Sequence, residues 1–80
     1  MPRVRGIQGP YQIFFTSFDC IEPPHIHVER DRMGCKFWIE PLELAYNRGF
    51  GAWELNRIQA LIENHRERIL EIWNAHCSRR

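Results

Sequence analysis

Glu22-Pro23-Pro24-His25-Ile26-His27-Val28-Glu29 is the stretch of sequence on which the arrangement of the rest depends. Its two prolines stiffen the approach to a segment whose alternation is typical of a strand. Side chains two residues apart on a strand point to the same face, so we expect His25 and His27 to project together. This EPPHIHV motif concentrates the potential chemistry of the chain.

Residues 25–30 and 35–40 predict a hairpin with a four-residue connection at 31–34. A register that pairs residues whose numbers sum to 65 places Ile26 opposite Ile39 and Val28 opposite Phe37 on one apolar face. The other face then carries three cross-strand pairs: His25 with Glu40, His27 with Trp38, and Glu29 with Lys36. A slip of one residue would turn every side chain over.

Three further strands are predicted around this hairpin. Residues 4–8 form a short first strand, and residues 11–17, dense in aromatic side chains, form a second with Tyr11, Ile13 and Phe15 on one face. Residues 18–24 are expected to be a loop, because adjacent prolines cannot both donate to a sheet. Residues 42–46 alternate as a last strand, which a turn at residues 47–49 follows.

The last third of the chain predicts one helix, residues 51–77. Its apolar stripe recurs at spacings of three and four, and Gly51 stands at the N-cap position with Glu54 in the first turn. A helix of about 25 residues spans roughly 37 Å, whereas a typical strand spans ~17–20 Å. We therefore expect one end to overhang the sheet and to offer apolar surface for a partner or for homo-oligomers. The stripe consists of Leu55, Ile58, Ile62, His65, Ile69, Ile72 and His76.

Strands first and a helix last are typical of the α+β class. The predicted fold is a small, mostly antiparallel sheet of four or five strands with one long C-terminal helix packed on one face. We expect a single domain over residues 1–80, with a β-rich part at 1–50 and the helix at 51–77.

Composition limits the classes of function and location. The net charge is about +1 with interspersed signs, which argues against a strong electrostatic footprint for nucleic acid. The apolar runs are too short for a membrane span or a secretion signal, so a cytoplasmic protein without membrane contact is expected. Cys20, Cys35 and Cys77 are odd in number and irregularly spaced, which favours reduced thiols over a disulfide framework.

Over nearly its whole length the chain resembles the small bacterial "domain of unknown function 4160" family. The matching segments, in order, are residues 22–28, Lys36-Phe37-Trp38-Ile39, residues 44–50, Glu54-Leu55 and Trp73-Asn74. The resemblance implies a stand-alone protein of uncharacterised activity, often encoded beside a second small protein, a pairing that resembles toxin–antitoxin organisation. The family's signature falls on His25 and His27 and not on the three cysteines, which disfavours a metal site that relies on them.

The two histidines admit three interpretations. They could bind a metal ion, with Glu29 or Glu40 completing the ligands, or perform acid–base chemistry beside Glu29 and Lys36, for example in RNA cleavage. Alternatively, they hold the entry to the strand by hydrogen bonds or contact a partner protein. Trp38 could stack on a base or anchor an interface. The catalytic candidates are therefore His25, His27, Glu29 and Trp38, and the sequence assigns no cofactor.

Turn cations and the helix histidines are weaker candidates. Arg30, Arg32, Arg48 and Lys36 could hold a phosphate, although such residues are ordinarily solvated. His65 is expected to be a hydrogen-bonded core residue rather than a ligand.

The leading hypothesis is a small protein that is one half of a toxin–antitoxin-like or regulatory pair. It would act on RNA or on its partner protein through the face that carries His25 and His27. A non-catalytic interaction module with structural histidines and a metal-dependent hydrolase are the alternatives.

Overall fold

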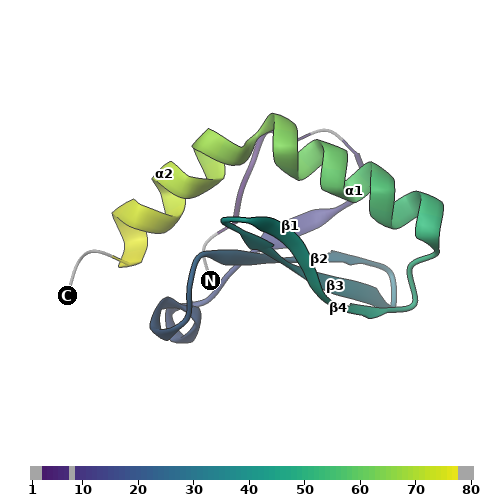
Figure 1. Cartoon of the computed structure of the whole chain (residues 1–80), viewed down its shortest axis with the longest axis horizontal. Coiled ribbons are helices and arrows are strands. Elements are labelled where there is room, and N and C mark those ends of the chain that lie inside the picture. The colour runs from purple at the N-terminus through teal and green to yellow at the C-terminus, as the bar shows by residue number, and fades with distance from the viewer. Residues whose placement is uncertain (1–2, 8, 78–80) are drawn as a thin grey trace.

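The computed structural model describes residues 3–7 and 9–77. They form an antiparallel four-stranded sheet and two helices that arch over one of its faces (Figure 1). The predicted α+β class is confirmed, with four strands and with two helices in place of one. In chain order the elements are β1 (Gln12–Phe14), the 3₁₀ helix η1 (Ser17–Ile21), β2 (His25–Arg30), β3 (Met33–Ile39), β4 (Leu42–Arg48), α1 (Ala52–Asn64) and α2 (Arg66–Cys77).

The strands lie side by side in the order β1-β2-β3-β4, each antiparallel to the next. The face toward the helices is mostly apolar. Its apolar residues from β1, β2 and β3 are buried, whereas Leu44 of β4 is 39% exposed. The opposite face points away from α1, and we call it the open face. At its His25 end it is reached by Trp73 of α2, whose ring centroid lies 5.2 Å from that of His25. One cross-strand row of the open face consists of Phe14, His27, Lys36 and Tyr46.

The predicted register of the β2–β3 hairpin is wrong by two residues. His25 pairs with Trp38, Ile26 with Phe37 and His27 with Lys36. The reason is a connection of two residues, at positions 31 and 32, where four were expected; Asp31 adopts φ 57°, a left-handed conformation that Asp tolerates. Because a shift of two leaves each side chain on its own face, the predicted division into an apolar and a polar face is nevertheless correct.

The N-terminal segment departs further from expectation. Residues 4–7 form no strand; an isolated bridge joins Arg3 to Phe14, while Gln8 lies outside the described residues. Gly6 and Gly9 take φ values of 88° and 115°, which interrupt an extended path. The second predicted strand shortens to β1, and the loop predicted at residues 18–24 contains most of η1 instead.

The predicted single helix is two helices that meet at His65. This residue has φ −116° and ψ 17°, outside the helical region, and its Nδ1 donates a hydrogen bond of 2.9 Å to the Leu61 carbonyl. The change of direction carries α2 toward the end of the sheet (Figure 1). In Figure 1, α2 runs on past the end of the strands, as expected for an overhanging helix end. Ile69 and Trp73 are nevertheless buried, so this end does not offer them as an apolar surface for a partner.

A disulfide between Cys20 and Cys77 joins η1 to the last residue of α2, so the prediction of reduced thiols is wrong for this pair. Spacing could not reveal it, because the two cysteines are 57 positions apart while their Cα atoms lie 5.4 Å apart. The contact is reinforced by Ser17, whose hydroxyl lies 2.9 Å from Nε2 of His76. Cys35 is a buried free thiol.

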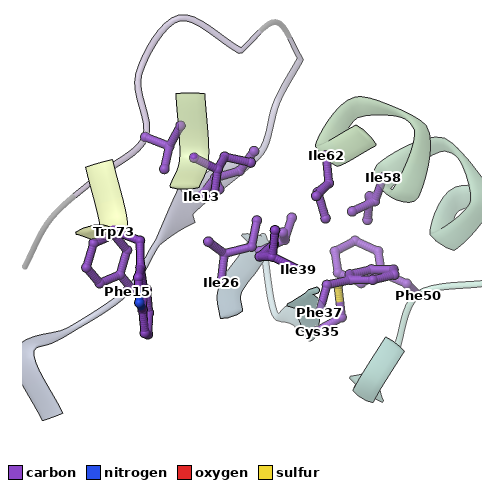
Figure 2. Packing of buried hydrophobic residues seen from close by; sticks show 13 residues of the cluster. Ile13, Phe15, Ile26, Cys35, Phe37, Ile39, Phe50, Ile58, Ile62 and Trp73 are labelled. Atoms are coloured by element: carbon purple, nitrogen blue, oxygen red, sulfur yellow. The ribbon is translucent and has the colours of Figure 1, made fainter. Parts of the chain in front are cut away.

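The core lies between the sheet and the helices (Figure 2). Ile58 and Ile62 of α1 point toward the middle of the sheet, where Phe37 and Ile39 lie. Beneath α2, the rings of Phe15 and Trp73 pack with their centroids 4.8 Å apart. This contact between Phe15 and Trp73 places α2 beside the end of the sheet that carries the EPPHIHV motif. Among the described residues, no helix has the length and apolar character that crossing a membrane requires.

Candidate functional site

His25, the first residue of β2, is completely buried, with 0% of its surface exposed. Its imidazole is enclosed by the rings of Trp38, Trp73 and His27, with centroids 5.2–5.3 Å away. Nδ1 lies 2.9 Å from the Pro23 carbonyl oxygen. A carbonyl oxygen can only accept, so Nδ1 carries the proton of this bond. The proline pair therefore orients the ring as well as the strand.

Asp19 of η1 reaches both histidines. Its Oδ1 lies 3.0 Å from Nε2 of His25, and its Oδ2 lies 3.3 Å from Nε2 of His27. The backbone N–H of Thr16 donates to Oδ2 at 2.7 Å, which fixes the carboxylate. Partial burial raises the pKa of Asp19, but the Thr16 hydrogen bond and the two imidazoles outweigh it and lower the pKa to about 2. Asp19 is therefore an anion at neutral pH.

His27 is the solvent-accessible member of this trio, with 24% of its side chain exposed. Its ring stacks on Phe14 with centroids 5.5 Å apart. Beside it, Lys36 extends over the Trp38 ring, with Nζ 4.5 Å from the centroid, and donates a hydrogen bond of 2.8 Å to Glu22. That hydrogen bond lowers the pKa of Glu22. Lys36 is thus held by an anion and an aromatic ring of its own chain.

The structure brings His25, His27 and Trp38 together and leaves out both predicted glutamates. Glu29 pairs with Gly34, farther along the strand, and Glu40 stands exposed in the β3–β4 turn, 4.0 Å from Arg66. Asp19 takes their place, because η1 folds back over the start of β2. Thr16 and Asp19 are three residues apart, the spacing of a helix N-cap and the third residue of the helix. This spacing is the signal in the sequence that could have indicated η1.

Asp19, His25 and His27 are the described residues whose side chains could hold a metal ion, with ligand atoms within 4.8 Å of one another. As an acid–base pair the two histidines are poorly placed. His25 has no surface that a substrate could touch, and both Nε2 atoms face the same carboxylate. The trio can therefore fix η1 or bind a cation more readily than it can exchange protons with a substrate.

Three of the four cations predicted to hold phosphate, Arg30, Lys36 and Arg48, have partners for their side chains within the chain. Arg30 makes two hydrogen bonds to Glu54 and pairs with Asp31. Arg48 donates to the Arg32 carbonyl at 3.3 Å. Lys36 and Arg30 therefore have their charges balanced by neighbouring carboxylates. The partner of Arg48 is a neutral carbonyl, so the charge at the β2–β3 turn is not balanced in this way.

A cavity of about 580 Å³ lies where α1 begins, beside the end of the β2–β3 hairpin. Tyr11, Arg30 and Glu54 form its hydrogen-bonded floor, and Trp53 and Arg57 contribute to its walls. The carboxylate of Glu54 already accepts from both Tyr11 and Arg30, so this floor is satisfied without a ligand.

Two large apolar side chains of η1 face solvent, and sequence reasoning missed both. Phe18 is 86% exposed and Ile21 is 82% exposed. Residues three apart lie on the same side of a 3₁₀ helix, so they form one apolar projection, which we call the η1 knob. Asp19, between them, points inward to the histidines.

Comparison with known proteins gives one match. The model of the family described as Domain of unknown function (DUF4160) matches residues 11–74. No curated protein and no solved structure matches the chain.

Proposed function

This chain belongs to the DUF4160 family, whose description leaves its activity open, and we propose that it works by binding a second protein, as one half of a toxin–antitoxin-like or regulatory pair. The contact surface in this proposal is the η1 knob, Phe18 and Ile21. The observation that carries it is their exposure, 86% and 82%, on a short helix that is otherwise tightly fixed.

Exposed apolar side chains on a rigid support suit a protein interface. Scattered exposed apolar residues are normal, but adjacent large ones on one projection are typical of interaction sites. The Cys20–Cys77 disulfide and the contacts of Asp19 hold η1 in place. Little conformational entropy would then be lost at that site when a partner covers the knob, which favours affinity.

A protein partner is favoured over RNA by the distribution of charge. RNA binding requires cations free to neutralise phosphates, and Lys36 and Arg30 are already paired with carboxylates. Arg32 and Arg48 are close to the β2–β3 turn, whereas η1 contacts the opposite end of β2 at His25. A catalytic role is disfavoured by the burial of His25, whose contact with Asp19 helps to position η1 instead.

The test uses the second small protein beside which members of the family are often encoded, as the resemblance implies. Isothermal titration of the two purified proteins should give saturable binding. The double variant Phe18→Ser/Ile21→Ser should weaken binding by roughly 30-fold or more, which corresponds to about 2 kcal/mol for a hot spot. Trp53→Ser is the matched control, because it removes a 68% exposed aromatic side chain from α1 and should leave the affinity unchanged.

Three outcomes would contradict the proposal. The knob variant could bind as tightly as the native chain, or the Trp53 control could lose as much affinity. Thirdly, the native chain could bind a labelled single-stranded RNA tightly at physiological salt and lose it on Lys36→Ala, which would make RNA the ligand. Light scattering of the chain alone measures its molar mass and so detects self-association. This includes the homo-oligomer expected through the C-terminal helices, which binding data alone could confuse with these outcomes.

A growth assay addresses the toxin-like half of the proposal. Induction of this gene alone in a bacterial host should arrest growth if the chain acts on a host protein through the knob, and Phe18→Ser/Ile21→Ser should relieve the arrest. Relief by His27→Ala in a chain that keeps its partner affinity would instead indicate catalysis by the histidines.

A further inference from the structure

The Nε2 atom of His25 is a buried polar atom without an aligned hydrogen bond. Nδ1 of the same ring donates to the Pro23 carbonyl, so in the neutral imidazole the proton is on Nδ1. Nε2 then presents a lone pair. A buried nitrogen in this state is unfavourable unless something binds it.

The atom that faces this lone pair is itself electron-rich. Oδ1 of Asp19 lies 3.0 Å from Nε2, so the two atoms would repel each other unless a positive charge lay between them. A positive charge between them would turn the repulsion into attraction. If that charge were a proton on Nε2, Oδ1 should lie along the N–H direction, and the contact lacks that hydrogen-bond alignment. The geometry therefore favours a larger cation, which binds each ligand atom separately.

We propose that Asp19, His25 and His27 bind a divalent transition-metal ion such as Zn²⁺. Two imidazole nitrogens and a carboxylate oxygen are ligands that zinc accepts in proteins. In a tetrahedral site with bonds of about 2.0–2.1 Å, neighbouring ligand atoms are roughly 3.3 Å apart. Here Nε2 of His25 lies 3.0 Å from Oδ1 of Asp19, and Nε2 of His27 lies 3.3 Å from Oδ2 of the same carboxylate. The three residues have ligand atoms within 4.8 Å of one another, so a small shift of these side chains would close them around one ion.

The surroundings of the trio also resemble those of a metal site. A metal-binding histidine characteristically donates its other ring N–H to a carbonyl or carboxylate, as His25 does to Pro23. The carboxylate is oriented in turn by the Thr16 N–H at 2.7 Å. Three protein ligands leave a fourth position for water, and the partly exposed His27 marks the side on which solvent is close.

The ion would fasten η1 to β2 at the end of the sheet where the disulfide fastens η1 to α2. This inference does not depend on the identity of a binding partner. It differs from the site expected from the sequence in its third ligand, which is Asp19 and neither Glu29 nor Glu40.

The test measures metal binding to the full, untagged chain with its disulfide intact, because reduced Cys20 and Cys77 would add thiolate ligands. After removal of metals with a chelator, titration with Zn²⁺ should show one ion per chain, and Co²⁺ should give the visible absorption of a tetrahedral centre. Asp19→Asn and His27→Gln should each weaken Zn²⁺ binding by about 100-fold or more. Neither position is as deeply buried as His25, so circular dichroism should show both variants folded.

Glu29→Gln is the matched control, since it alters a carboxylate on the same strand and face and should leave Zn²⁺ affinity unchanged. Absence of Zn²⁺ heat and of Co²⁺ bands would overturn the proposal. It would also be overturned by equal affinity in the native, Asp19→Asn and His27→Gln chains, or by an equal loss in the Glu29 control. Nitrogen NMR supplies an independent readout: a proton retained on Nε2 of His25 with equimolar Zn²⁺ present would identify the cation as the proton and overturn the metal assignment.

Discussion

Arg30 at the end of β2 and Glu54 in the first turn of α1 form a two-point ion pair, with Nε–Oε2 at 2.9 Å and Nη2–Oε1 at 2.7 Å. The Tyr11 hydroxyl donates to the same carboxylate at 2.7 Å. Paired hydrogen bonds of this kind fix orientation as well as distance. The contact sets where α1 begins over the sheet, and it places a carboxylate near the positive end of the helix dipole.

Replacement of Glu54 by Gln should lower stability at neutral pH and have little effect in acid. Hydrogen bonds from Arg30 and Tyr11 lower the pKa of Glu54. A lowered carboxyl pKa contributes stability that is present above the ordinary carboxyl range and is lost as pH falls through the folded-state value. Thermal unfolding of both chains at several pH values measures this. Glu71→Gln, at an exposed position of α2, is the control, and a pH-independent difference for Glu54 would contradict the assignment.

Replacement of Ile62 by Ala should destabilise the chain by about 2–5 kcal/mol, because it removes a buried side chain and leaves a cavity. Ile62 has no exposed surface and packs between α1 and the sheet. Chemical denaturation measures the free energy of unfolding. Ile21→Ala makes the same chemical change in the η1 knob and should alter that free energy by less than about 0.5 kcal/mol. Similar losses for the two would mean that η1 is buried in solution.

Cys35 should resist thiol reagents in the folded chain. Burial raises the pKa of this thiol to about 11, so at pH 8 almost none of it is the reactive thiolate. Titration with Ellman's reagent at pH 8 should detect almost no thiol in native protein and one per chain in denaturant without reductant. Three thiols in denaturant would show that Cys20 and Cys77 are not joined.

Substitution of both Cys20 and Cys77 by Ser should destabilise the chain by about 4 kcal/mol. The disulfide closes a loop between residues 57 positions apart, and in the chain-entropy model a cross-link of that span restricts the unfolded chain by about this amount. Denaturation under non-oxidising conditions measures the difference. Limited proteolysis should then cut first near η1, whose attachment to α2 depends largely on this bond. A first cut within α1 would place the weakest region elsewhere.

Periodicity predicted the faces of the sheet well because the side-chain period of a strand is two. An error of two residues in the hairpin register therefore moved the partners of His25 and His27 without moving either histidine to the other face. The connection at Asp31 and Arg32 determined the register, and the residues there do not single out a two-residue turn over a four-residue one.

Contacts between segments distant in the sequence determined the helix break and the position of Asp19, which periodicity could not predict. The apolar stripe continues across His65 at helical spacing, so the break between α1 and α2 is not visible in the pattern; it allows Trp73 to pack on Phe15. Of the residues that the structure brings together at the candidate site, the sequence singled out His25, His27 and Trp38, which come from one hairpin. Asp19 was missed because its approach depends on how η1 folds back, which no spacing along the chain reveals.

The disulfide also divides the chain by covalent topology. Residues 20–77, which include β2, β3, β4 and both helices, lie on a closed ring. A pulling force applied before residue 20 and after residue 77 would pass through the Cys20–Cys77 bond and bypass everything within that ring. Mechanical load could peel away β1, while the hairpin that carries His25 and His27 would remain unstretched.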